Sequence, residues 1–111
     1  MSKRDSGLLI DDILLAISKI KIYTEGLDFD GFMADSKTVD AVERNFEIIG
    51  EAANQLPKSF QEANSAIAWH SIVSFRNRLI HGYFGVDYQI IWYLIKNDLP
   101  DLEDKFLAIK I

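Results

Sequence analysis

The sequence contains no cysteine, and this absence excludes several kinds of site at once. Disulfides, thiolate nucleophiles and zinc sites built on cysteine cannot form, and the composition fits a reducing compartment. No apolar run approaches the ~18 residues of a membrane-spanning helix. The early Asp5, Asp11 and Asp12 are unlike a signal peptide. We therefore expect a cytoplasmic protein with no membrane partner.

Positive charge is also scarce, because 12 Lys and Arg stand against 17 Asp and Glu, for a formal net charge of -5. A protein that holds nucleic acid over a broad basic surface relies on many phosphate contacts, so this balance disfavours that class. A compact cluster such as Arg76, Arg78 and His81 can still hold phosphate, since exposed charges farther apart than about 8 Å are largely screened at physiological salt. Any role with nucleic acid must therefore be local.

Proline occurs only twice, and hydrophobic residues make up 49% of the chain. A chain of this length buries roughly two-thirds of its unfolded surface, and we expect one domain over residues 1–111. No segment alternates convincingly with the period of two that is typical of a strand, whereas apolar residues recur at helical spacing. The sequence therefore predicts an all-α fold.

Capping residues set the boundaries of the first predicted elements. A first helix starts at a cap provided by Asp5 or Ser6 and ends near Gly26. Residues 27–36, which are rich in Asp and include a Gly, are predicted as a loop.

The second predicted helix starts at Ser36 and stops at Pro57, and its apolar residues step by three or four. Gly50 lies inside this helix. A glycine there costs about 1 kcal/mol relative to alanine, which the close approach of another helix would offset. A short helix over residues 58–64 follows.

The second half begins with a predicted helix from Trp69 to His81, which Gly82 is suited to end as a left-handed residue. Asp87 caps the next helix. Pro100 fits the first turn of a last helical piece or a kink in a longer one. Together the elements predict an antiparallel, up-and-down bundle of about four to five helices.

The octapeptide 76–83 places an arginine, a histidine and a tyrosine at fixed spacing where a helix should end. At about 100° per residue, Arg76 falls in the middle of a broad apolar arc. An unpaired guanidinium there would carry a desolvation penalty, so it needs a carboxylate partner, a wet cleft or an anionic ligand such as phosphate. A buried ion pair with Glu43 or Glu47 is the plainest of these readings.

His81 lies where helix carbonyls end, a place that favours the protonated imidazole. With an unperturbed pKa of about 6.5, a histidine can act as acid or base in cleavage at phosphate. The plainer reading is a histidine that only caps carbonyls. Arg76 and His81 are about 140° apart around an ideal helix. Joint action therefore requires a cleft that wraps the helix end, or a second chain.

A metal site is not expected at the histidines. His70 and His81 lie on nearly one face, but they are roughly 16 Å apart along the helix axis, too far to share one zinc ion. Tyr83 has a hydroxyl suited to phosphate and a ring suited to stacking on a base, or it is an ordinary surface tyrosine. We expect no metal and no cofactor.

The pattern Arg76-x4-His81-x-Tyr83 resembles the signature of HEPN-domain proteins of the HepT type, the toxin halves of toxin–antitoxin pairs. Three further segments resemble the family, at residues 41–53, 82–87 and 97–100. The resemblance extends over roughly residues 6–108.

The resemblance implies an antiparallel helical bundle that dimerises and brings two such motifs into one cleft. It also implies metal-independent endoribonuclease activity. In that activity Arg76 binds the scissile phosphate and stabilises its developing charge, while His81 moves the proton of the attacking 2′-hydroxyl or leaving oxygen. Asn77 and Arg78 would bind or orient the substrate.

The resemblance further implies a homodimer or a higher even oligomer, and a nucleotidyltransferase antitoxin of the MntA type as partner. That enzyme transfers AMP from ATP to the motif tyrosine, here Tyr83, as in type VII toxin–antitoxin systems. The added phosphate and bulk would exclude RNA from Arg76 and His81.

Two other functions remain open. The first is a non-catalytic helical partner, or nucleotide-binding subunit, of a minimal nucleotidyltransferase, which the acidic charge favours. The second is a purely structural dimerisation bundle in which Arg76 pairs with Glu47 and nothing reacts.

Overall fold

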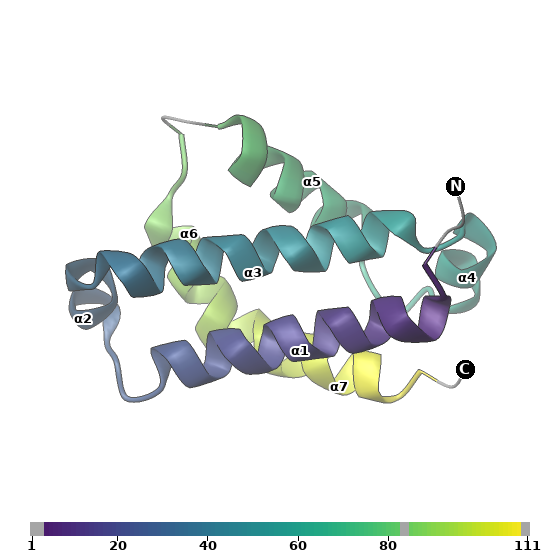
Figure 1. Ribbon diagram of the computed structural model, residues 1–111, viewed down its shortest axis with the longest axis horizontal. Coiled ribbons are helices and arrows are strands. Elements are labelled where there is room, and N and C mark those ends of the chain that lie inside the picture. Colours follow the sequence, from purple (N-terminus) through teal and green to yellow (C-terminus); the bar gives the residue numbers. More distant parts are fainter. Residues whose placement is uncertain (1–3, 83–84, 110–111) are drawn as a thin grey trace.

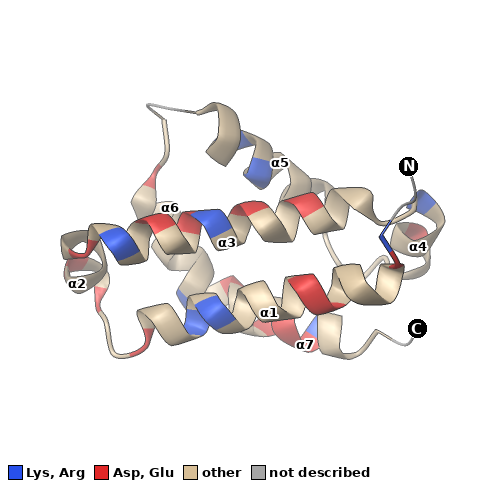
Figure 2. Cartoon of the chain, viewed as in Figure 1, with Lys and Arg blue, Asp and Glu red and all other residues tan. Residues whose placement is uncertain are grey.

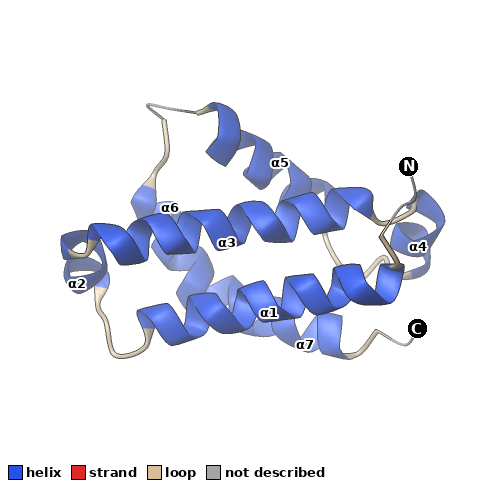
Figure 3. Cartoon of the chain, viewed as in Figure 1, coloured by secondary structure: helices blue, strands red, loops and turns tan. Residues whose placement is uncertain are grey.

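The computed structural model describes residues 4–82 and 85–109, and every regular element in this part of the chain is helical (Figure 3). The all-α prediction is therefore confirmed. The elements are α1 Ser6–Thr24, α2 Phe29–Ala34, α3 Ser36–Gln55, α4 Lys58–Ala63, α5 Trp69–His81, α6 Tyr88–Tyr93, the π-helical turn η1 Leu94–Asp98, and α7 Leu99–Leu107.

Four long segments form the bundle, and successive ones run in opposite directions, as predicted (Figure 1). Helices α1 and α3 lie side by side along the long axis of the molecule. Helix α5 packs on α3 on the side away from α1, and α6, η1 and α7 follow one another without a break behind both long helices. The short helices α2 and α4 lie at the two ends of α3.

Aspartate side chains begin four of these helices. Asp5, Asp28, Asp35 and Asp87 each accept a hydrogen bond from a backbone N–H in the first turn of α1, α2, α3 and α6. Such a bond satisfies an N–H that has no partner within the helix. The predicted caps at the starts of α1 and α6 are confirmed, and at α1 the cap is Asp5.

The prediction of a loop over residues 27–36 is wrong, because the six-residue helix α2 occupies most of it. The helix forms because of a tertiary contact that the local sequence does not show. Phe32 of α2 is fully buried, and its ring lies 5.2 Å from that of Trp92 on α6, centroid to centroid. A helix this short is marginal in isolation, so burial of Phe32 stabilises it.

The core is formed mainly by α1, α3 and the continuous segment from α6 to α7. Helix α5 contributes only Trp69 to the fully buried set, and its other apolar residues are half-buried. Pro100 lies in the first turn of α7, directly after η1, which fits the prediction of a first-turn proline. None of the helices in the described part of the chain combines the length and apolar character needed to cross a bilayer.

Helices α3 and α5 touch at backbone distance where Gly50 meets Arg76. A Cβ atom added to Gly50 would overlap Arg76 Cβ and lie 2.6 Å from Arg76 Cγ. Only a glycine leaves room for the arginine side chain to start there. The close approach of another helix, which the sequence analysis required to explain Gly50, is thus the approach of α5.

Replacing Gly50 by alanine should lower the free energy of unfolding by about 1–3 kcal/mol, because the added methyl overpacks the contact between α3 and α5. This predicted loss is the net change, after the ~1 kcal/mol that alanine gains from helix propensity. Urea unfolding followed by circular dichroism measures the difference. Gly85→Ala is the control, since an added Cβ there meets no atom of the described residues within 4 Å, its chain neighbours aside. Equal or higher stability of Gly50→Ala would contradict this account.

Candidate active site at the end of α5

Helix α5 carries four of the five residues predicted for the site. Its last two turns hold Arg76, Asn77, Arg78 and His81, and the two arginines are its only charged residues apart from histidine (Figure 2). The neighbouring α3 bears several carboxylates, so a basic helix end lies beside an acidic helix. Tyr83, the predicted modification site, lies outside the described residues.

Arg76 is held by two side chains. Its Nη2 donates to Glu51 Oε1 on α3 at 2.6 Å, and its Nη1 donates to Asn77 Oδ1 at 2.7 Å. The arginine side chain is 21% exposed and that of Glu51 is 45% exposed. A guanidinium in a half-buried apolar setting needs such partners, because its desolvation is otherwise uncompensated.

The predicted partner of Arg76 was wrong in position, since the carboxylate is that of Glu51 rather than Glu43 or Glu47. Helical periodicity shows which residues share a face of α3, but not the level at which α5 crosses it. The crossing lies at Gly50, so the next residue along α3 reaches the guanidinium. The sequence did contain a signal for this partner. Glu51 directly follows Gly50, the glycine at which the close approach of another helix was expected.

The guanidinium of Arg76 retains donors that no described residue accepts. Its Nε is buried and has no hydrogen-bond partner within residues 4–82 and 85–109. A guanidinium carries five N–H donors in a fixed planar fork, which matches the geometry of phosphate and carboxylate oxygens. Arg76 is therefore fixed in place, and because Nε is buried, an external anion would have to bind the second N–H groups of Nη1 and Nη2.

Asn77 was predicted to orient substrate or His81, and in the structure its Oδ1 accepts a hydrogen bond from Arg76. Arg78 and His81 are both exposed in the last turn of α5. Within the described part of the chain the imidazole of His81 makes no hydrogen bond, so its two nitrogens face solvent rather than a fixed partner. The arrangement leaves His81 accessible to an external group.

The prediction that Gly82 adopts a left-handed conformation is wrong, because its φ is -96°. The Gly82 N–H instead donates to the carbonyl of Arg78 at 2.8 Å, which continues the right-handed turn. A Cβ at this position would lie 2.5 Å from that same carbonyl oxygen. Glycine is thus required here for space rather than for φ.

Two hollows flank α5 on the side that faces α6 and α7. A cavity of about 310 Å³ lies between the end of α5 and the start of α6, and a second of about 270 Å³ lies between α5 and α7. Phe75 lines both, Arg78 lines the first, and most of the other lining residues are apolar. The residues that the structure describes therefore cover the apolar face of α5 only in part.

Glu43 on α3 lies beside Tyr88, the first residue of α6. Hydrogen bonding to the Glu43 carboxylate, burial and the negative charge of that carboxylate raise the pKa of Tyr88 to about 12. Tyr88 is therefore a neutral hydroxyl at physiological pH, and the ion pair of Arg76 is made with Glu51 rather than with Glu43. Among the described residues no three His, Asp or Glu side chains gather as a metal-binding group, and His70 is exposed on α5.

Replacing Glu51 by glutamine should lower the free energy of unfolding by about 1 kcal/mol, because Arg76 loses its countercharge while staying half-buried. Thermal or urea unfolding measures the loss. Glu47→Gln is the matched control, since Glu47 lies one turn earlier on α3 and takes part in none of the ion pairs within the described ranges. Equal stability changes for the two variants would show that the contact with Arg76 contributes nothing.

Comparison with known proteins places the chain in a family. It matches the family model described as ribonuclease HepT-like over residues 13–109. A Thermococcus cleftensis protein named "Probable ribonuclease HepT" is 40% identical over 104 residues, which cover 94% of this chain and 94% of that protein.

Two further relatives have names that propose an RNase. One from Methanocaldococcus jannaschii is 39% identical over 91% of this chain and 84% of its own length. One from Caldanaerobacter subterraneus subsp. tengcongensis is 46% identical over 71% of this chain and 70% of its own length. No solved structure matches the chain significantly. The family model and these relatives agree, and the chain belongs to the HepT-like ribonuclease family.

Proposed function

We propose that this chain is the toxin of a type VII toxin–antitoxin system, a metal-independent endoribonuclease whose active site forms where two copies meet. The observation that carries the proposal is Arg76, a partly exposed guanidinium that Glu51 and Asn77 hold through one donor each, which leaves one N–H on Nη1 and one on Nη2 without a partner among the described residues. A fixed cation with free donors suits a scissile phosphate, because it stabilises charge that develops during cleavage without having to reorganise.

In the proposed reaction the 2′-hydroxyl of the RNA attacks the adjacent phosphorus, and the bond to the 5′-oxygen breaks. Arg76 binds the non-bridging oxygens, on which negative charge grows. His81 takes the proton of the attacking hydroxyl or gives one to the leaving oxygen, for which its exposed imidazole is free. Arg78 supplies a second positive charge one turn from the end of α5, and Asn77 keeps Arg76 in position.

Dimerisation is proposed on two grounds. Arg76 and His81 are five residues apart on one helix, and Arg76 points to α3 while His81 is exposed at the helix end, so one chain does not aim both at the same phosphate. The half-buried apolar residues of α5 and the two hollows beside it leave a surface that a second copy can cover. Pairing at α5 would bring Arg76 of one copy toward His81 of the other.

Purified parent protein should cleave single-stranded RNA in the presence of a metal chelator, and Arg76→Ala and His81→Ala should each lower the rate by a factor of about 100 or more. Gel analysis of labelled RNA measures the rate. Lys58→Ala is the matched control, because Lys58 is an exposed cation of α4, which lies at the end of α3 far from the last turn of α5 (Figure 1). Cleavage by His81→Ala at the parent rate would overturn the catalytic assignment.

Mixing the two inactive variants tests the shared site. A heterodimer of Arg76→Ala with His81→Ala still contains one Arg76 and one His81, on different chains. If these two act together across the interface, the mixture regains activity that neither variant has alone. If each chain uses its own pair, the mixture stays inactive and the dimer-interface site is wrong while the ribonuclease assignment stands.

The proposed regulator is a nucleotidyltransferase antitoxin of the MntA type, which would transfer AMP to Tyr83, two residues beyond His81. An added phosphate near Arg78 and His81 would repel and exclude an RNA phosphate. Incubation with the enzyme and ATP should add the mass of one AMP group and stop cleavage, whereas Tyr83→Phe should gain no mass and stay active. Tight binding of that enzyme by a chain that never cleaves RNA would instead favour a non-catalytic partner.

A further inference from the structure

Helix α1 exposes three large aliphatic side chains in one row. Leu8, Leu15 and Ile22 are 46%, 55% and 62% exposed, and successive members are seven residues apart. Seven residues turn through about 700°, only ~20° short of two full turns, so the three lie along one line on the helix. We call this line the outer stripe.

The outer stripe lies opposite the face of α1 that packs into the core. Ile13 and Ile17, both fully buried, are two residues before and after Leu15, and two residues turn through about 200°. Leu15 therefore points about 160° away from each of them. A helix on the surface of a monomer has one apolar face and one polar face, whereas a helix that is apolar on opposite faces is covered on both.

The spacing of the outer stripe is symmetric about Leu15, because Leu8 and Ile22 lie seven residues before and after it. A second copy of α1 laid antiparallel, with the two-fold axis at Leu15, would bring Leu15 against its own equivalent. Leu8 of each copy would then meet Ile22 of the other. Seven residues fall ~20° short of two full turns, so the stripe slowly winds around the helix. Two packed helices accommodate this deviation by coiling slightly around each other.

Charges on one flank of the outer stripe have the same symmetry. Asp12 follows Leu8 by four residues and Lys19 follows Leu15 by four, so both lie on the same side of the stripe. The two-fold axis would place Lys19 of one copy level with Asp12 of the other, to within about 1.5 Å along the helix. In the described part of the single chain Lys19 takes part in no ion pair.

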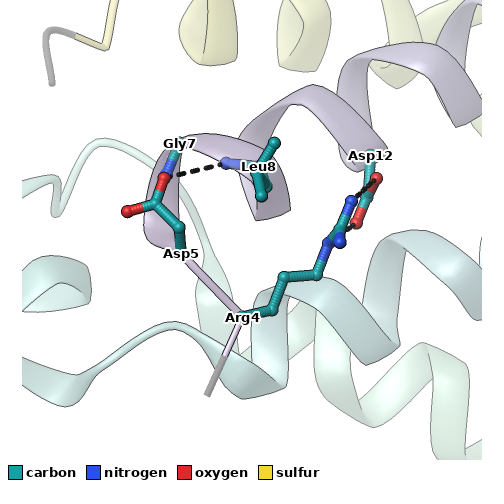
Figure 4. A network of polar contacts seen from close by, with 5 residues as sticks. All are labelled: Arg4, Asp5, Gly7, Leu8 and Asp12. Atoms are coloured by element: carbon teal, nitrogen blue, oxygen red, sulfur yellow. Dashed lines mark hydrogen bonds and ion pairs between the residues drawn. The ribbon is translucent and has the colours of Figure 1, made fainter. Parts of the chain in front are cut away.

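Asp12 is already fixed in position to receive that lysine. Arg4 holds its carboxylate through two hydrogen bonds, Nε to Oδ2 at 2.7 Å and Nη2 to Oδ1 at 3.0 Å (Figure 4). Leu8 lies on the same side of the helix, one turn before Asp12. A carboxylate held in this way loses little side-chain freedom when a lysine joins it.

We propose that the outer stripe of α1 is a self-association surface whose occupant is α1 of a second copy of this chain, packed antiparallel about Leu15 and flanked by two pairs of Asp12 with Lys19. This contact is distinct from the proposed catalytic dimer at α5, because α1 and α5 lie on either side of α3 (Figure 1). A chain with both contacts assembles beyond a dimer.

Measurement of the mass of the purified chain in solution, by light scattering or sedimentation, tests the proposal. Leu15→Glu should reduce the assembled mass by a factor of two or more, since it places a carboxylate against its own equivalent. Lys19→Glu should do the same by opposing Asp12. Combining Asp12→Lys with Lys19→Glu should restore the parent mass, because the charges across the two-fold axis are again opposite.

Leu107→Glu is the matched control, a leucine at the end of α7 that is exposed at least as much as Leu15 (64% against 55%) and should leave the mass unchanged. Circular dichroism confirms that each variant is folded. Unchanged mass in Leu15→Glu, or a double charge reversal that stays dissociated, would overturn the proposal. RNA cleavage is measured in parallel. Cleavage retained by the dissociated Leu15→Glu variant separates this surface from the α5 contact, whose residues that variant leaves unchanged. A parent protein that never cleaves RNA but still loses mass on Leu15→Glu would overturn the proposed function and leave this surface in place.

Discussion

The contact between Gly50 on α3 and the base of the Arg76 side chain is the constraint on which the site depends. Because glycine has no Cβ, the two helices meet at backbone distance, and the arginine side chain starts in a space that any other residue would fill. That contact fixes the level at which α5 crosses α3. It also decides that Glu51, the next residue along α3, is the carboxylate within reach of the guanidinium.

Helix α5 is attached to the bundle along one face only. Its sole fully buried residue is Trp69 at the first position, whose indole N–H donates to the carbonyl of Asn64. Toward the end of the helix, Phe75 and Leu79 pack against the edge of the core and also line the two hollows. The end of α5 is therefore less enclosed than its start, and the candidate site residues lie there.

The whole chain has a negative net charge, whereas the candidate site at the end of α5 is positively charged. Helix α5 bears no carboxylate, and of its two arginines one is partly neutralised by Glu51. A substrate phosphate would meet a short, local positive charge on an acidic molecule. Binding of this kind rests on few phosphate contacts, so its dependence on salt is shallow compared with that of proteins with broad basic surfaces.

The order, type and bounds of the main helices were determined by the sequence alone, because caps and helical periodicity act locally. The helix from Trp69 to His81 and the cap at Asp87 are where they were predicted, and the resemblance to the HepT type and the ribonuclease class are confirmed by the family comparison. The loop prediction over residues 27–36 failed because burial of Phe32 by a distant part of the chain stabilises α2.

Only the tertiary structure decided which carboxylate binds Arg76 and why Gly82 is a glycine. The first depends on the distance between α3 and α5, and the second on the distance between Gly82 and the carbonyl of Arg78. The helical periodicity of the sequence predicts neither distance. A sequence pattern shows which residues share a face, whereas the level at which two helices cross is set by the packing of every side chain between them. The sequence therefore names candidate site residues, but not the partner that holds Arg76.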